Sequence, residues 1–303
     1  MKHTLKITLL LVFIFFVTQI IGLAITNEYL FVKESIDPET LIVTKEIISE
    51  DLPYSLERPE IDASSSYIWI LAAIIVGTLF LLLIIRFKKM NLWKLWFFLA
   101  VFFTMAIAFS AFIPQTFAAI LALILAIMKI YRPTTIINNS TEVFIYGGLA
   151  AIFVPVLNLS AAFMLLFLIS IYDIIAVRHT KHMVKLAKFQ TKSKVFAGLM
   201  IPYGEKIAGK QKGIISKKEV GSFAVLGGGD IGFPLIFAGV VMKDLMLNNP
   251  ELIGFLKTLI IPLFVSLALL YLLVRSRKDR FYPAMPYLTV GCVIGYLIVL
   301  LFF

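Results

Sequence analysis

Charged side chains are scarce in this 303-residue chain, where Asp, Glu, Lys and Arg make up 15% of the residues against 60% hydrophobic residues. A soluble domain has about 25% charged residues, so the composition excludes an ordinary soluble protein and indicates a membrane protein. Cysteine occurs once, at Cys292, which excludes an intrachain disulfide. Histidine occurs three times, and each histidine lies beside basic residues. Because His179 and His182 have no third ligand nearby, we expect loop residues there and no metal site.

Long apolar runs, in contrast, are abundant. A membrane-spanning helix needs roughly 20 apolar residues, and Pro, Gly and Asn residues mark the breaks between the runs. The sequence predicts an all-α, polytopic membrane protein that forms a single membrane domain over residues 1–303. Nine spans are predicted, at residues 5–26, 67–86, 92–113, 115–131, 136–157, 160–177, 220–242, 251–274 and 282–303.

The first predicted span resembles a signal peptide in having Lys2 and Lys6 ahead of an apolar run. A secretory signal has an apolar region of about 7 to 15 residues followed by a small-residue cleavage site. The run from Leu5 to Thr26 is longer, and it has no Ala-x-Ala sequence. We therefore expect this helix to be retained in the mature protein.

The net charge of +10 does not indicate nucleic acid, because the basic residues are clustered in the short connections between apolar runs. With nine spans and a cytoplasmic N-terminus, 23 of the 28 Lys and Arg residues fall on the cytoplasmic side. Segment 27–66 then lies outside the cytoplasm and holds ten acidic residues against three basic ones. The positive-inside rule therefore predicts the N-terminus inside and the C-terminus outside, in a multi-pass protein of the cell membrane.

Two segments are predicted to lie outside the bilayer. Segment 27–66 contains scattered Val, Ile and Leu residues and is expected to form a small cap of strands and loops on the extracytoplasmic side. Segment 178–219 is a basic cytoplasmic loop that begins with an amphipathic stretch, which we expect to lie on anionic headgroups. A regulatory or cleaved loop is the alternative interpretation of segment 178–219.

Two aspartates, Asp173 and Asp230, lie inside predicted spans. An ionisable side chain at that depth costs several kcal/mol, so it marks a functional site by default. A rise of 1.5 Å per residue places Asp173 roughly 7 Å inside the cytoplasmic boundary and Asp230 roughly 16 Å inside it, if the segment before Asp230 is helical. Three consecutive glycines make an unbroken helix there doubtful. Both carboxylates belong to the same leaflet, on consecutive spans, so we expect them to meet.

Two carboxylates a few ångströms apart do not both ionise easily, so such a pair shares one proton and titrates in two steps. The ionised member can deprotonate a water molecule while the protonated member donates to a carbonyl oxygen. This chemistry needs neither a metal nor a covalent intermediate. On the two acids alone, a hydrogen-bonded pair between helices or a relay in a proton- or ion-coupled transporter fits as well.

The neighbours of the two acids add information. Gly227 and Gly229 have no side chains where an extended peptide would approach Asp230, although close helix packing explains glycines in membranes too. The last predicted span opens on Pro283-Ala284-Met285-Pro286. Its prolines predict a non-helical start, and irregular backbone at membrane depth is tolerated only where it is buried or lines a watery cavity. Such a segment is also able to pair with a substrate strand.

The chain carries three short motifs, which contain Asp173, Asp230 and Pro283. They resemble the motifs of the presenilin and signal peptide peptidase family of intramembrane aspartyl proteases, and the chain is similar to archaeal members of that family. The Tyr-Asp motif of the family matches Tyr172-Asp173, and its Gly-x-Gly-Asp motif matches Gly227, Gly228, Gly229 and Asp230. Its Pro-Ala-Leu motif matches Pro283, Ala284 and Met285, with Met in place of Leu, which is a volume-conserving change. The resemblance covers essentially the whole chain. It implies that Asp173 and Asp230 are catalytic and that the residues around them shape the active site.

By the same resemblance, the predicted orientation is that of presenilins and opposite to that of signal peptide peptidases. The implied substrates are single-span membrane proteins with the N-terminus outside. No cofactor, nucleic acid or obligate partner subunit is implied. Rival hydrolases fit less well, because the chain lacks His-Glu-x-x-His and has no histidine at membrane depth. A prepilin-type aspartyl peptidase has fewer spans and no Pro-Ala-Leu element, and a proton- or ion-coupled transporter is the alternative outside the proteases.

Overall fold

Helices make up most of the computed structural model, which describes residues 5–36, 43–87, 89–180, 183, 186, 189–190, 195–203, 222–276 and 282–302. The helices are α1 (Leu5–Asn27), α2 (Ser66–Arg86), α3 (Met90–Ser110), α4 (Gln115–Tyr131), α5 (Thr135–Phe153), α6 (Leu159–Ile174), α8 (Gly228–Asn248), α9 (Glu251–Thr258), α10 (Ile260–Arg275) and α11 (Met285–Phe302). A 3₁₀ turn, η1, spans Pro53–Ser55, and a π turn, η2, spans Ile175–His179. The strands are β1 (Leu30–Ile36), β2 (Val43–Ser49), β3 (Gly198–Tyr203) and β4 (Ser222–Gly227).

Each of the nine predicted spans contains a helix. Within the described residues, six helical segments are long and apolar enough to cross a membrane, and α4 is a shorter apolar helix. Helices α5 and α8 are not among the six. Helix α5 carries buried polar side chains, such as Asn138 and Glu142, and these lower its hydropathy. Two antiparallel hairpins accompany the helices, since β1 pairs with β2 inside segment 27–66, where strands were expected, and β3 pairs with β4, which was not predicted.

The predicted span 220–242 needs a correction. Residues 222–227 form strand β4, and helix α8 begins only at Gly228. Asp230 therefore lies in the first turn of its helix, and the depth of roughly 16 Å expected for a continuous helix does not apply. The boundary falls at the three glycines 227–229, which had made an unbroken helix doubtful.

The predicted span 251–274 is also interrupted, since α9 ends at Thr258 and α10 begins at Ile260. Pro262 lies in the first turn of α10. A proline has no N–H to donate to the carbonyl four residues earlier, and in an unbroken helix that carbonyl would belong to Thr258. The break at Leu259 is thus explained by Pro262.

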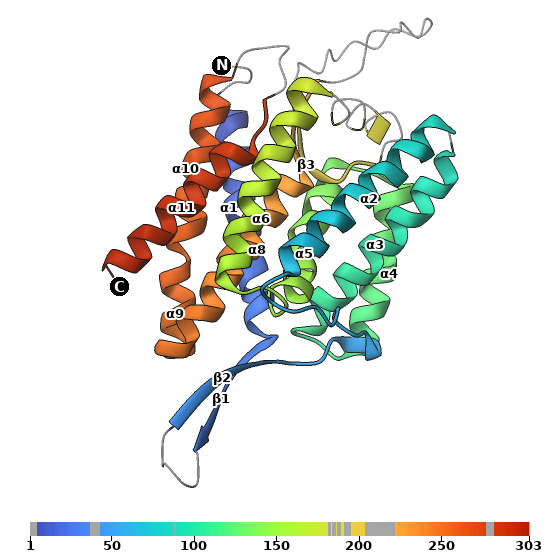
Figure 1. Cartoon of the computed structure of the whole chain (residues 1–303). Helices are drawn as coiled ribbons and strands as arrows, with labels where there is room; N and C mark the ends of the chain where they lie inside the picture. The colour runs from blue at the N-terminus through green and yellow to red at the C-terminus, as the bar shows by residue number, and fades with distance from the viewer. Residues whose placement is uncertain are drawn as a thin grey trace, which may run out of the picture.

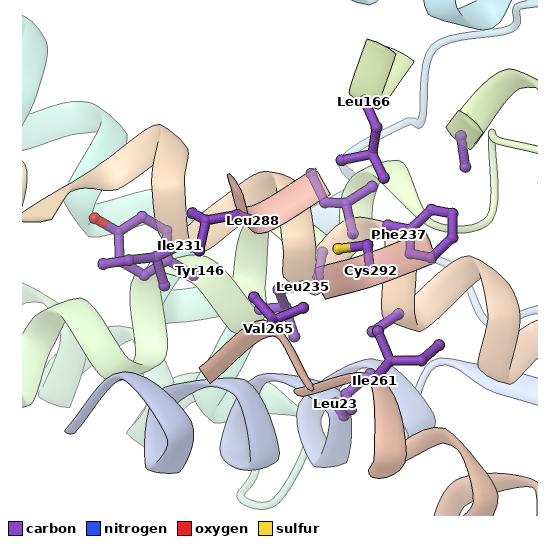
Figure 2. Close-up of a cluster of buried hydrophobic side chains, with 14 of the residues drawn as sticks. Leu23, Tyr146, Leu166, Ile231, Leu235, Phe237, Ile261, Val265, Leu288 and Cys292 are labelled. Carbon is purple, nitrogen blue, oxygen red and sulfur yellow. The ribbon is translucent and has the colours of Figure 1, made fainter. Parts of the chain in front are cut away.

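Helix α8 lies at the centre of the helical bundle. Every residue from Pro234 to Met242 is buried, which is the pattern of a helix enclosed by protein on all sides. Helices α1, α5, α6, α10 and α11 all contact α8. Figure 2 shows part of this core, where Leu235 and Phe237 of α8 lie near Cys292 of α11 and Ile261 of α10. Asp230 is therefore carried by the most enclosed helix of the bundle.

Two helix crossings depend on glycine. A Cβ atom added at Gly148 of α5 would lie 1.9 Å from the backbone oxygen of Thr104 in α3. A Cβ added at Gly295 of α11 would lie 2.8 Å from the Cα of Ile261 in α10. Small residues that allow backbones to approach closely are typical of helix contacts in membranes.

The two hairpins lie at opposite ends of the bundle (Figure 1). The β1–β2 hairpin, inside the segment 27–66 expected to form a cap, projects away from the helices, while β3 lies at the other end. Helix α2 lies on the outside of the bundle and buries only Ser66, Ile70 and Ile84. It contacts α6 and α3, so most of its apolar surface faces outward.

Candidate active site

A cavity of about 360 Å³ opens at the β3 end of the bundle. Eight of the nine predicted site residues line this cavity, namely Tyr172, Asp173, Gly227, Gly228, Gly229, Asp230, Ala284 and Met285. The ninth, Pro283, is buried directly before Ala284. The three motifs are thus brought together from three separate parts of the chain.

Asp173 lies in the last turn of α6, just before the π turn η2, and is 8% exposed. The backbone N–H of Met285 donates to its Oδ2 atom over 3.1 Å. The first N–H groups of a helix have no partner within the helix, and Met285 is the first residue of α11. The non-helical start of α11, which the prolines predict, therefore presents its free donors to Asp173.

Asp230 is the third residue of α8, and Gly227 is the residue that caps the helix. The Asp230 carboxyl group turns back toward Gly227, since a Cβ atom added there would lie 3.3 Å from its Oδ2 atom. The carboxyl group therefore lies beside the start of its own helix. A carboxylate is favoured at this position, because a helix N-terminus carries a partial positive charge.

The two acids thus lie at one site. Asp173 accepts from the N–H of Met285 at the start of α11, and Asp230 lies in the first turn of α8. Both line the same cavity. Direct contact between the two carboxyl groups stays a prediction.

Hairpin β3–β4 leads directly into α8 and is fixed by two asparagines of α5. Asn138 donates to the Gly198 carbonyl over 2.8 Å. Asn139 binds both backbone groups of Met200, donating to its oxygen over 2.8 Å and accepting from its N–H over 3.0 Å. Sequence reasoning did not identify these residues, although two adjacent asparagines in an apolar run were an available signal.

A buried ion pair lies beside these asparagines. The Nζ of Lys129 is 2.7 Å from Oε1 of Glu142, and the two side chains are 2% and 1% exposed. Lys129 also donates to Oδ1 of Asn138 and to Thr141. Tyr146 donates its hydroxyl hydrogen to the other carboxylate oxygen of Glu142. The sequence analysis counted Lys129 among the basic residues of the cytoplasmic connections. The structure corrects this, because Lys129 is buried and paired inside the protein.

Other predicted positions differ in their contacts. Tyr172 donates to Thr78 of α2 over 3.2 Å, so its hydroxyl connects α6 to α2 at the edge of the cavity. Met183 and Leu186, which were expected to lie on headgroups, line the cavity instead. Most of the predicted loop 178–219, including the question of its cleavage, lies outside the described residues.

Solved structures provide a comparison for the fold. A presenilin family intramembrane aspartate protease in space group C222 matches with a TM-score of 0.59 and 18% identity, covering 96% of this chain and 95% of that chain. A presenilin family intramembrane aspartate protease in space group P2 matches with a TM-score of 0.58 and 21% identity, covering 96% of each chain. At these identities the matches show that the fold is shared.

A comparison with curated proteins gave no significant match. The family model described as signal-peptide peptidase, presenilin aspartyl protease matches residues 29–303. This range contains both aspartates, the glycine motif and the Pro-Ala-Met segment. The family that matches is neither that of the prepilin-type peptidases nor one of transporters. The chain belongs to the signal-peptide peptidase and presenilin family of aspartyl proteases.

Proposed function

We propose that this intramembrane aspartyl protease uses Asp173 and Asp230 as its catalytic pair. The ionised carboxylate removes a proton from a water molecule, which attacks the carbonyl carbon of the scissile peptide bond. The protonated carboxyl group donates to the carbonyl oxygen, and the tetrahedral intermediate then collapses with proton transfer to the leaving nitrogen. The cavity beside the two acids is the place for the peptide bond, and Gly227 and Gly229 keep its wall free of side chains.

The observation that carries this proposal is that both carboxyl groups line one cavity, each beside the start of a helix. The N–H of Met285 is fixed by α11, so Asp173 is oriented before any substrate arrives. Asp230 is held by its place in the first turn of the buried helix α8. An arrangement of this kind supports general acid and base catalysis without further reorganisation.

The proposal extends to membrane topology and substrates. Nine spans with a cytoplasmic N-terminus and an external C-terminus remain the topology that the distribution of Lys and Arg favours. In this orientation the cavity and hairpin β3–β4 face the cytoplasmic leaflet, and hairpin β1–β2 lies outside. We propose single-span membrane proteins as substrates, cleavage without an obligate partner subunit, an archaeal source, and residence in the cell membrane.

The test uses the full chain, purified in detergent, with a single-span substrate. We expect Asp173→Asn and Asp230→Asn each to abolish cleavage, because a neutral amide neither accepts the proton of water nor supplies one to the carbonyl oxygen. Asp244→Asn is the matched control, since Asp244 is an exposed acid on the same helix α8 as Asp230. Cleavage that survives either of the first two substitutions removes that aspartate from the mechanism. Ion flux in vesicles without cleavage would favour the transporter.

A further inference from the structure

Tyr146 of α5 lies against the first turn of α8, which contains the Gly-x-Gly-Asp motif and Asp230. A Cβ atom added at Gly228 would lie 2.6 Å from the Tyr146 hydroxyl oxygen and 3.3 Å from two ring carbons. A Cβ added at Gly232, one turn later, would lie 3.6 Å from the Tyr146 ring. The tyrosine therefore packs on the glycine face of the helix start, beside the proposed catalytic carboxyl group.

The position of Tyr146 is fixed by the buried ion pair. Its hydroxyl group donates to Glu142, and Glu142 is held by Lys129 over 2.7 Å. Lys129 is held in turn by Asn138 and Thr141, at 2.9 and 3.0 Å. A fully satisfied polar network in a buried setting gives its members a single arrangement, so the Tyr146 hydroxyl has little freedom to move away from Gly228.

Gly228 is the x of the Gly-x-Gly-Asp motif, a position at which the motif specifies no residue type. Here that position has no room for a side chain, because the Tyr146 hydroxyl already fills the space. The pairing of a tyrosine on α5 with a glycine at this position is thus a feature of this chain. It links the α4–α5 polar cluster to the turn that presents Asp230.

We propose that Tyr146 is a positioning residue, which acts through Gly228 to set the place of the Asp230 carboxyl group opposite Asp173. The proposal rests on the catalytic role assigned to Asp230 above. Tyr146 takes no part in proton transfer to the substrate. It orients the helix start, so its loss lowers turnover more than it weakens substrate binding.

The test measures kcat and KM separately on the purified full chain with a single-span substrate. Tyr146→Phe removes the hydrogen bond to Glu142 and releases the ring, and Gly228→Ala introduces the methyl group that the hydroxyl excludes. A small misplacement of catalytic groups lowers rates by roughly 10- to 100-fold. We expect a fall of that size in kcat for each variant, with KM changed less than about twofold.

The double variant provides a readout that a purely structural role would not give. Tyr146→Phe removes the oxygen that lies 2.6 Å from the new Cβ, so it should relieve the crowding caused by Gly228→Ala. Residues in direct contact show non-additive effects. We expect kcat of the double variant to exceed that of Gly228→Ala by at least ~threefold. Tyr146→Phe would then lower kcat in the wild-type background and raise kcat in the Gly228→Ala background.

Tyr29→Phe is the matched control. Tyr29 is also buried and donates its hydroxyl hydrogen to a backbone oxygen, that of Ile107, over 2.7 Å, but it lies at the β1–β2 end of the bundle. We expect this variant to keep wild-type kcat even if its unfolding temperature falls as far as that of Tyr146→Phe. An equal fall of kcat in Tyr29→Phe overturns the proposal, as does wild-type kcat in Tyr146→Phe or a double variant no faster than Gly228→Ala.

Asp230→Asn in the same series distinguishes a failure of the catalytic role of Asp230 from a failure of the positioning role of Tyr146. If Asp230→Asn still cleaves, the catalytic assignment fails, and the positioning role falls with it. If Asp230→Asn is inactive while Tyr146→Phe keeps wild-type kcat, only the positioning role is wrong.

Discussion

The backbone N–H of Met285 donates to the carboxyl group of Asp173 over 3.1 Å, across 112 residues of sequence. This hydrogen bond joins the end of α6 to the start of α11 and makes the Pro-Ala-Met segment a direct partner of an acidic side chain. The motif therefore contributes through its backbone, and the departure from Leu to Met leaves that contribution intact.

Met285→Pro tests this contact. Proline is well tolerated at the first position of a helix, so the variant should fold while losing the donor to Asp173. A hydrogen bond to a charged group contributes about 1.5–3 kcal/mol, which corresponds to a roughly 10- to 100-fold fall in kcat. Met285→Leu keeps both the N–H and the side-chain volume, and it should cleave at the wild-type rate. Equal rates for the two variants would show that this N–H is not required for cleavage.

Asn139→Leu should loosen the hairpin that leads into α8. The substitution leaves the N–H and the carbonyl of Met200 without their partner, and each unsatisfied buried group costs about 1–3 kcal/mol. We expect a lower unfolding temperature together with reduced cleavage. Asn158→Ala is the control, because it removes the cap of α6 at about 1 kcal/mol without touching the hairpin. If Asn158→Ala reduces cleavage as strongly as Asn139→Leu, the effect is one of general stability.

Lys129→Met should be strongly destabilising, since it leaves the Glu142 carboxylate buried without its counter-ion. Removal of one partner of a buried ion pair costs about 3–5 kcal/mol. The double variant Lys129→Met with Glu142→Gln removes both charges and keeps an acceptor for Tyr146. We expect its thermal unfolding midpoint to lie above that of Lys129→Met alone. A double variant that is less stable than the single one would contradict the assignment of the ion pair.

Gly148→Ala and Gly77→Ala form a matched pair of helix substitutions. An added Cβ at Gly148 would lie 1.9 Å from the backbone oxygen of Thr104, whereas nothing lies within 4 Å of a Cβ added at Gly77. We expect Gly148→Ala to lose about 1–3 kcal/mol of stability through overpacking. Gly77→Ala should gain about 0.5–1 kcal/mol through its better helix propensity. Thermal unfolding in detergent measures both, and similar midpoints would argue against the close crossing of α3 and α5.

The residues singled out in the sequence line one cavity, whereas the elements that hold them were predicted less well. Asp173, Asp230 and the Pro-Ala-Met segment were noticed because ionisable and helix-breaking residues stand out in apolar runs, and their catalytic role stays a prediction. Strand β4 was missed, since hydropathy does not distinguish a short buried strand from a buried helix.

The polar cluster on α4 and α5 was missed for a different reason. Lys129 lies close to Arg132 near the end of a predicted span, where a flanking charge is the usual interpretation. Its partner Glu142 lies 13 residues later, near the start of the next predicted span. Opposite charges on the facing ends of consecutive spans were the available signal. Which of such charges pair inside the protein depends on helix rotation, and the sequence does not provide that information.

The sparse packing of α2 has a mechanical consequence. Ile74 and Thr78 of α2 border the cavity, yet few side chains of this helix are buried. A displacement of α8 would disturb its packing against six helices, whereas α2 contacts mainly α3 and α6. The wall of the cavity that α2 forms would therefore yield at a smaller loss of protein contacts than the wall that carries Asp230.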